Sequence, residues 1–201
     1  MNKINKILNF GIDFSKTKPL LILRDIFIFF ITYCIIGWIY EEFVFAIEKH
    51  ILVNRGFLFG PWLPIYGFGG LIIISIFYRT KNNPIKVGKV NIRPLIIYIE
   101  SCIFSVTVEL LTTYFIEFTG GDFTTLWEYN DEFMNFQGRI ALIPGAKFGI
   151  IAIVGIYLIQ PILNRYVTKN DKKTNMMAIS IAILFSIDLI SRIWLGRNFV
   201  G

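Results

Sequence analysis

Long runs of apolar residues alternate with short polar segments along this chain. The apolar runs cover residues 25–47, 64–79, 95–118, 139–163 and 176–196. A bilayer core of about 30 Å is spanned by about 20 helical residues, because a helix rises 1.5 Å per residue. The pattern therefore predicts an all-α, polytopic integral membrane protein with about five transmembrane helices.

Lysine and arginine residues are concentrated in alternate polar segments. The arm 1–24 and the loops 79–93 and 164–173 are basic, whereas the loops 48–63 and 119–138 are not. Because cytoplasmic loops carry the excess of Lys and Arg, the N-terminus is predicted inside the cell and the C-terminus outside. We divide the chain into a basic cytoplasmic or interfacial arm, 1–24, in which Pro19 ends an amphipathic helix, and a single transmembrane helical domain, 25–201.

The polar segment between the first two predicted helices has an unusual composition. It reads Asn54-Arg55-Gly56-Phe57-Leu58-Phe59-Gly60-Pro61-Trp62-Leu63-Pro64-Ile65-Tyr66-Gly67. Gly permits unusual backbone angles, Pro fixes φ, and the large aromatic side chains need a surface to pack on. Two structures fit this composition. One is a re-entrant segment enclosed by protein or a water-filled cavity, and the other is an interfacial turn with Trp62 and Tyr66 at the level of the head groups.

Several ionisable residues fall inside the predicted helices, where each costs about 2.5–3.5 kcal/mol and by default indicates function. They are Glu41, Glu42, Glu109, Arg139 and Arg192 in the outer half, with Lys147 and Asp188 nearer the middle. One interpretation is a set of buried salt bridges that lock the helices together. The other is a polar cavity open to the outside, in which Arg55, Arg139 and Arg192 hold an anionic group, since a guanidinium fork fits such groups. The acids of that cavity can gate it, carry protons or act as a base.

Helical spacing places small and acidic residues together. Gly37 lies four residues before Glu41, so both share one face and a second helix can approach the carboxylate closely. On the third predicted helix, one stripe contains Ser101, Ser105, Glu109 and Thr112 or Thr113. Such a stripe is typical of a helix interface or a cavity lining.

The order of these features suggests a weak parallel repeat of helices 1–2 and 3–4. Each pair has acidic residues towards the end of its first helix, then an Asn, Arg and Gly segment, then a Pro near the start of its second helix. Parallel repeats are known among transporters. Chance similarity between apolar segments is the alternative.

Composition narrows the function classes. The chain is 55% hydrophobic and 17% charged, beyond the usual apolar share of a soluble domain. Its net charge of +6 is explained by the basic loops and requires no nucleic-acid partner. Cys34 and Cys102 lie in apolar runs as reduced packing residues, and His50 is the one histidine, so we expect no metal site and no cofactor. The sequence contains no Walker A motif, and it identifies no catalytic residue.

Two blocks of residues resemble a known family. The first is Gly37-Trp38-x-x-Glu41 followed by Asn54-Arg55-Gly56-Phe57-Leu58-x-Gly60-Pro61-x-x-Pro64-Ile65-Tyr66-Gly67-x-Gly69. The second contains Glu109, Trp127-Glu128-Tyr129 and Phe133-x-Asn135-x-Gln137-Gly138-Arg139-Ile140, with Glu128 where the family pattern has Asp. Over residues 25–196 the chain resembles small bacterial membrane proteins labelled ABC-transporter permeases of the CmpB type. The resemblance implies a multi-pass protein of the cell membrane and a transporter component.

The matching positions and the charge argument together give the candidate site. The candidate substrate-binding residues are Trp38, Glu41, Asn54, Arg55, Tyr66, Glu109, Asn135, Arg139 and Arg192. Structural roles are expected for Gly37, Gly56, Gly60, Pro61, Pro64, Gly67 and Gly138.

Three functions fit these observations. The first is a permease-like subunit with an outward-facing polar cavity for an anionic or amphipathic ligand, which needs a separate ATPase subunit or a homo-oligomer. The second is an intramembrane enzyme or carrier that acts on lipid head groups at the outer leaflet. The third is a structural accessory membrane protein. Membrane lipids are partners in all three, and a nucleic acid in none.

Overall fold

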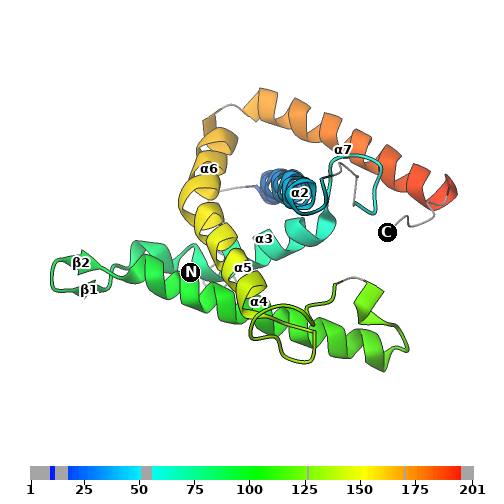
Figure 1. Ribbon diagram of the computed structural model, residues 1–201. Coiled ribbons are helices and arrows are strands. Elements are labelled where there is room, and N and C mark those ends of the chain that lie inside the picture. The colour runs from blue at the N-terminus through cyan, green and yellow to red at the C-terminus, as the bar shows by residue number, and fades with distance from the viewer. Residues whose placement is uncertain (1–9, 12–17, 51–55, 126, 170, 196–201) are drawn as a thin grey trace. The chain divides into compact units, whose positions relative to one another are not determined.

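The computed structural model describes residues 10–11, 18–50, 56–125, 127–169 and 171–195 (Figure 1). It is all-α apart from one short hairpin. The chain forms two compact units, which are described separately: unit 1 comprises residues 1–76 and 160–201, and unit 2 comprises residues 77–159. The predicted single transmembrane domain, 25–201, stays a prediction.

Unit 1 is built from the helices α2 (Pro19–Lys49), α3 (Pro64–Phe77), α6 (Gln160–Lys169) and α7 (Asp171–Leu195). The amphipathic helix that Pro19 was predicted to end lies outside the described residues. Helix α2 begins earlier than the predicted residue 25, with Pro19 as its first residue. Proline is favoured there, since its fixed φ suits the first turn and its missing N–H would have no helical partner. Pro64 occupies the same position in α3.

The core of unit 1 joins the segment before α3 to α2 and α7. Leu58 and Trp62 are buried against Ile31 and Cys34 of α2. Phe185 of α7 completes the core, with its ring centroid 5.9 Å from that of Trp62 and the two rings edge to face. Burial of such aromatic side chains contributes about 1.5–3 kcal/mol each, so this segment is a packed part of the fold.

Unit 1 also contains a buried polar network that the sequence analysis did not identify. Gln160 is fully buried, accepts a hydrogen bond of 2.8 Å from the Tyr33 hydroxyl and donates one of 3.1 Å to the Phe10 carbonyl. At the start of α2, Arg24 forms a 2.6 Å ion pair with Asp25 and a 2.7 Å hydrogen bond to Asn175 of α7. The signal was available, because Gln160 interrupts an apolar run.

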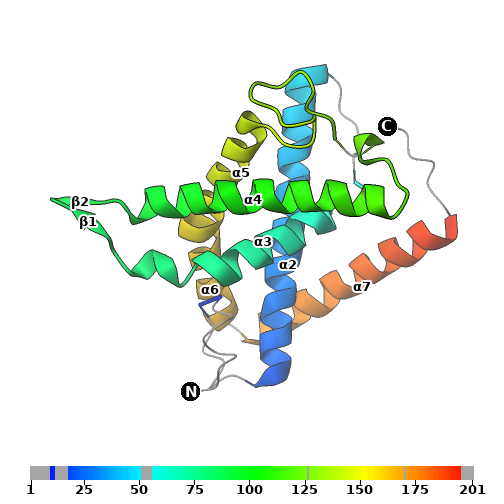
Figure 2. The same cartoon turned by 90° about the horizontal axis from the view of Figure 1, so that it is seen from below.

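Unit 2 contains η1 (Thr80–Asn82), the strands β1 (Lys86–Val87) and β2 (Val90–Asn91), α4 (Arg93–Phe118), η2 (Phe123–Thr125), α5 (Leu142–Val154) and the π-helical segment η3 (Gly155–Ile159). The strands form an antiparallel hairpin where only a turn was expected. Gly88 at its tip has φ +62°, which glycine adopts at little cost. Figure 2 shows the hairpin projecting beyond the N-terminal end of α4.

Helix α5 crosses α4 in both views and packs against it (Figures 1 and 2). The stripe of small and acidic residues expected on α4 is confirmed in part, since Ser101 and Thr113 are fully buried. The π-helical segment follows α5 directly, and the Lys81 ammonium reaches its Ile156 carbonyl at 3.3 Å. This hydrogen bond joins η1, which contains Lys81, to the π-helical segment.

In the described part of the chain, four helices are long and apolar enough to cross a membrane. They cover Pro19–Ile47, Arg93–Phe118, Leu142–Thr168 and Lys172–Leu195. The protein is therefore a multi-pass membrane protein. Helix α3 forms as predicted but has 14 residues and is not among the four, so the fifth crossing and the orientation of the chain stay predictions.

Candidate functional site

The glycine- and proline-rich segment is fastened to α7 by one carboxylate. Asp188 Oδ1 accepts the Phe59 N–H at 3.0 Å, and Oδ2 accepts the Gly60 N–H at 2.8 Å and the Trp62 indole N–H at 2.7 Å. A Cβ at Gly60 would lie 2.9 Å from Asp188 Oδ2, so a side chain there would disturb the carboxylate. Asp188, from a distant part of the sequence, thus fixes the conformation of residues 59–62.

Arg192, one turn after Asp188, is buried beside the same segment. Its guanidinium carbon lies 4.4 Å from the ring centroid of Phe57 and 5.9 Å from that of Phe59. A guanidinium over an aromatic face is stabilised by about 0.5–2 kcal/mol, more when water is excluded. The aromatic side chains of Phe57 and Phe59 therefore stabilise the Arg192 guanidinium by cation–π contacts.

The structure brings Glu41 and Tyr66 together in unit 1. The Tyr66 hydroxyl of α3 donates a hydrogen bond to Glu41 Oε1 of α2. A Cβ at Gly37 would collide with the Tyr66 side chain, so only glycine allows the tyrosine to lie across α2 and reach the carboxylate. The structural role expected for Gly37 thus has a physical reason.

Unit 2 has a similar pairing around Glu109. The Tyr129 hydroxyl donates to Glu109 Oε1 at 3.0 Å, while Glu109 Oε2 is buried and has no hydrogen-bond partner among the described residues. The Tyr129 N–H bonds the Gly138 carbonyl at 2.9 Å, which ties the segment 127–139 to itself. The segment is therefore linked internally and contacts α4 through Tyr129.

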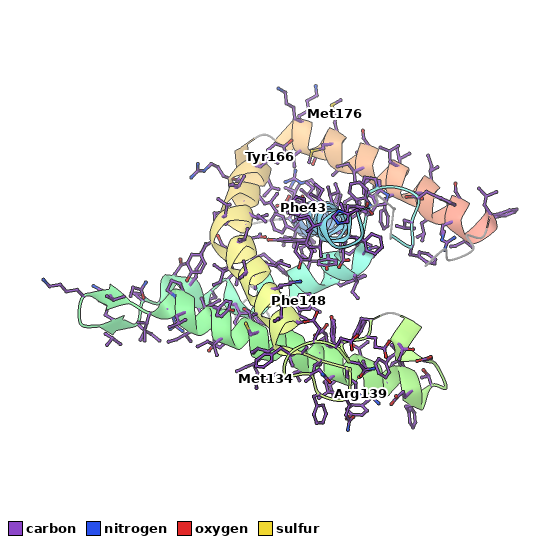
Figure 3. The ribbon with its side chains drawn as sticks, in the orientation of Figure 1. Phe43, Met134, Arg139, Phe148, Tyr166 and Met176 are labelled. Atoms are coloured by element: carbon purple, nitrogen blue, oxygen red, sulfur yellow. The ribbon has the colours of Figure 1, made fainter. Side chains whose placement is uncertain are left out.

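Arg139 at the end of this segment is clamped against α4, beside which it is labelled in Figure 3. Its Nη2 lies 2.7 Å and 2.8 Å from the two carboxylate oxygens of Glu117. Its guanidinium carbon is 4.5 Å from the ring centroids of both Tyr114 and Phe123. Its Nη1 is buried and has no hydrogen-bond partner in the described part of unit 2.

Asn135 and Gly138 shape the turn that carries Arg139. The Asn135 amide donates to the carbonyls of Asn130 and Glu132 at 2.9 Å and 3.0 Å and accepts the Gly138 N–H at 3.2 Å. Gly138 has φ +66°, and a Cβ there would collide with Asn130. The structural role predicted for Gly138 follows from both facts, and Asn135 serves as the organiser of the turn.

The candidate residues thus fall into two groups within separate units. Glu41, Tyr66, Arg192 and half-buried Trp38 belong to unit 1, and Glu109, Asn135 and Arg139 belong to unit 2. Asn54 and Arg55 lie outside the described residues. Gly56 and Gly67 are buried, while Pro61 is exposed at the bend before Trp62.

Sequence reasoning missed the acceptor role of Asp188 and the contacts of Tyr129 and Glu117. Asp188 was predicted only as an ionisable residue inside a helix, and its carboxylate accepts three hydrogen bonds from the segment 59–62. Among the described residues, no group of three or more His, Cys, Asp or Glu is arranged to hold a metal ion.

Replacing Arg139 with alanine is expected to destabilise the protein by about 2–3 kcal/mol, because two charge-assisted hydrogen bonds and two ring contacts are lost. Partly exposed Glu117 recovers some solvation, which keeps the cost below that of a fully buried pair. Arg139→Lys should recover less than half, since an ammonium has no planar fork. The readout is thermal unfolding in detergent, with Lys89→Ala in the exposed hairpin turn as control. A lysine variant as stable as the parent would contradict the clamp.

A family model described as "Putative ABC-transporter type IV" matches residues 28–193, which include both units and every described candidate residue. The chain belongs to this family. Neither the search of curated proteins nor that of solved structures found a match. Membership of this family gives the class of protein. The ligand and the roles of individual residues have to be inferred from the contacts described above.

Proposed function

We propose that this protein is the membrane-embedded subunit of a transporter, that a separate polypeptide supplies its ATPase, and that its ligand is anionic or amphipathic. Membership of the ABC-transporter type IV family and four long apolar helices support the first statement. The absence of a Walker A motif from the sequence supports the second.

One observation carries the third statement. Arg139 Nη1 and Glu109 Oε2 are both buried in unit 2 without a hydrogen-bond partner among the described residues. A buried polar atom left in this state costs about 1–3 kcal/mol, and more when it is charged. An anionic ligand group would satisfy the arginine.

The remaining candidates belong to the same proposal. Trp38, Glu41, Asn54, Arg55, Tyr66 and Arg192 are the proposed ligand contacts of unit 1. The proposal also includes the fifth crossing by α3, a cytoplasmic N-terminus, an external C-terminus and a cavity that opens outward. In that orientation the basic loops 79–93 and 164–173 face the cytoplasm, where an ATPase docks.

The test is purification of the tagged protein at native expression level in mild detergent, followed by mass spectrometry of everything bound. We expect a stoichiometric ATPase that is lost when the basic residues of 79–93 or 164–173 are neutralised. Neutralising Asp122, Asp131 and Glu132 in the loop 119–138 is the matched control and should leave the ATPase bound. A partner-free protein that carries one lipid species, released by Glu41→Gln, would overturn the transporter in favour of an enzyme or carrier for lipid head groups.

A purely structural role is the second candidate, because the Asp188 and Glu117 carboxylates are both used in internal contacts. If it holds, Glu41→Gln lowers the yield of folded protein but leaves any transport activity per folded molecule unchanged. If the transporter proposal holds, the same variant alters transport at unchanged yield. The two measurements, yield and transport per molecule, therefore separate the candidates.

A further inference from the structure

Two glycine contacts, one in each unit, use the same residue types at the same spacing. In unit 1, a Cβ on Gly67 of α3 would lie 2.5 Å from Cys34 Sγ and 2.6 Å from the Phe30 ring of α2. The matching contact in unit 2 is made by Gly149 of α5 with Cys102 and Tyr98 of α4, again at under 3.0 Å. In both units an aromatic residue and a cysteine four positions later pack directly on a glycine backbone.

The correspondence extends along the helices. Phe30, Cys34 and Glu41 each lie 68 residues before Tyr98, Cys102 and Glu109. Burial follows the same register in the first helices, where Phe29 and Ile97 are both fully buried. In the second helices, Gly67 and Ile74 each lie 82 residues before Gly149 and Ile156, and all four are buried. One shared register per helix, with matched packing, is more than a resemblance between apolar segments.

The equivalent glutamates also have equivalent partners. The Tyr66 hydroxyl donates to Glu41 Oε1, and the Tyr129 hydroxyl donates to Glu109 Oε1. Both glutamates lie within helices long and apolar enough to span a membrane. The two tyrosines come from different places, one from α3 and one from the segment before α5, so the carboxyl–phenol pair is present in both units despite different connections.

We propose that α2–α3 and α4–α5 are two copies of one helix pair, and that Glu41 and Glu109 are the equivalent proton-binding carboxyls of the two copies. This goes beyond the proposed function, since proton binding requires neither an ATPase nor a transported ligand. Each unit then carries one site at which a proton is taken up and released within the membrane.

The surroundings of Glu109 favour a proton on its carboxyl group. Glu109 Oε2 has no donor within the described part of unit 2, and an ionised oxygen buried in this way is strongly disfavoured unless it gains a proton or a partner. Arg139, at the end of the segment that carries Tyr129, is paired with Glu117, two turns further along α4. Glu41 accepts a hydrogen bond from the Tyr66 hydroxyl, as Glu109 does from that of Tyr129.

The test uses a hydrophobic carbodiimide, which adds covalently to protonated carboxyls in apolar surroundings, on the purified full-length protein. Peptide mapping by mass spectrometry should find adducts on Glu41 and Glu109, both declining as the pH is raised. Glu117 is the matched control on the same helix as Glu109, because it is partly exposed and forms an ion pair with Arg139. Glu41→Gln should remove one adduct and leave the other at full yield, with gel filtration confirming that the variant is folded.

Tyrosine variants sharpen the test, because the phenol stabilises the charged carboxylate. Tyr66→Phe should raise the labelling rate of Glu41 alone, and Tyr129→Phe that of Glu109 alone, each by up to about tenfold. Labelling of only one glutamate, or of neither, would overturn the equivalence of the two sites. Labelling of Glu117 as fast as Glu109 would overturn the assignment to proton binding. These readouts need no partner, so a failed search for an ATPase does not affect them.

Discussion

Asp188→Ala is expected to destabilise unit 1 by about 3–5 kcal/mol, because three hydrogen bonds to a carboxylate are lost at once. The backbone N–H groups of Phe59 and Gly60 and the Trp62 indole would all lose their acceptor. Trp62 then loses its fixed position against Phe185, and the contact between α7 and the rest of the unit is weakened. Detergent unfolding followed by tryptophan fluorescence measures the effect.

Two further variants divide this cost among the three bonds. Asp188→Asn keeps one carbonyl oxygen and should cost about half as much as Asp188→Ala. Either the Phe59 N–H or the Gly60 and Trp62 donors then lack an acceptor. Trp62→Phe removes the indole donor while keeping an aromatic ring in the core. Asp131→Ala, an exposed acid in the loop 119–138, is the control. If Asp188→Ala has the same unfolding free energy as the control, the carboxylate does not hold the segment 59–62.

The helices could be predicted from the sequence because each is an apolar run long enough to bury or to meet lipid. Their ends could not, and Pro19 shows why: the same residue ends one helix or begins the next, depending on which flank packs. The glycine- and proline-rich segment was recognised as structured because its aromatic residues require a surface. The element that supplies the surface, α7, is more than 120 residues away, and no local pattern points to it.

The candidate site shows the same limit. Glu41, Glu109 and Arg139 were selected because charge inside a membrane is costly, and the structure gives Glu41, Glu109 and Arg139 the partners Tyr66, Tyr129 and Glu117. Such pairings depend on tertiary contacts between a helix and a loop, so spacing alone could not assign them. The repeat was suggested by the order of acids and prolines, and the register that we propose for it rests on the packing of Gly67 and Gly149.

Gly67→Ala and Gly149→Ala are expected to destabilise the protein to a similar extent, by about 1–3 kcal/mol each, because each new methyl group is forced into side chains of the facing helix. At Gly67 the facing atoms are Cys34 Sγ and the Phe30 ring, and at Gly149 they are Cys102 Sγ and the Tyr98 ring. Packed rings cannot retreat without opening the helix pair. The measurement is again unfolding in detergent, compared with the parent chain.

Gly69→Ala is the matched control, since nothing lies within 4 Å of a Cβ there. It should be neutral or stabilising by up to about 1 kcal/mol, because alanine is the better helix former. Removal of the facing sulfur should relieve part of the strain, so Cys34→Ala should cost less in the Gly67→Ala background than in the parent, with a coupling of about 0.5–2 kcal/mol. Cys102→Ala should show the same coupling to Gly149→Ala. Two equal couplings are what a duplicated helix pair requires, and a coupling at one glycine without the other would show that the two contacts arose separately.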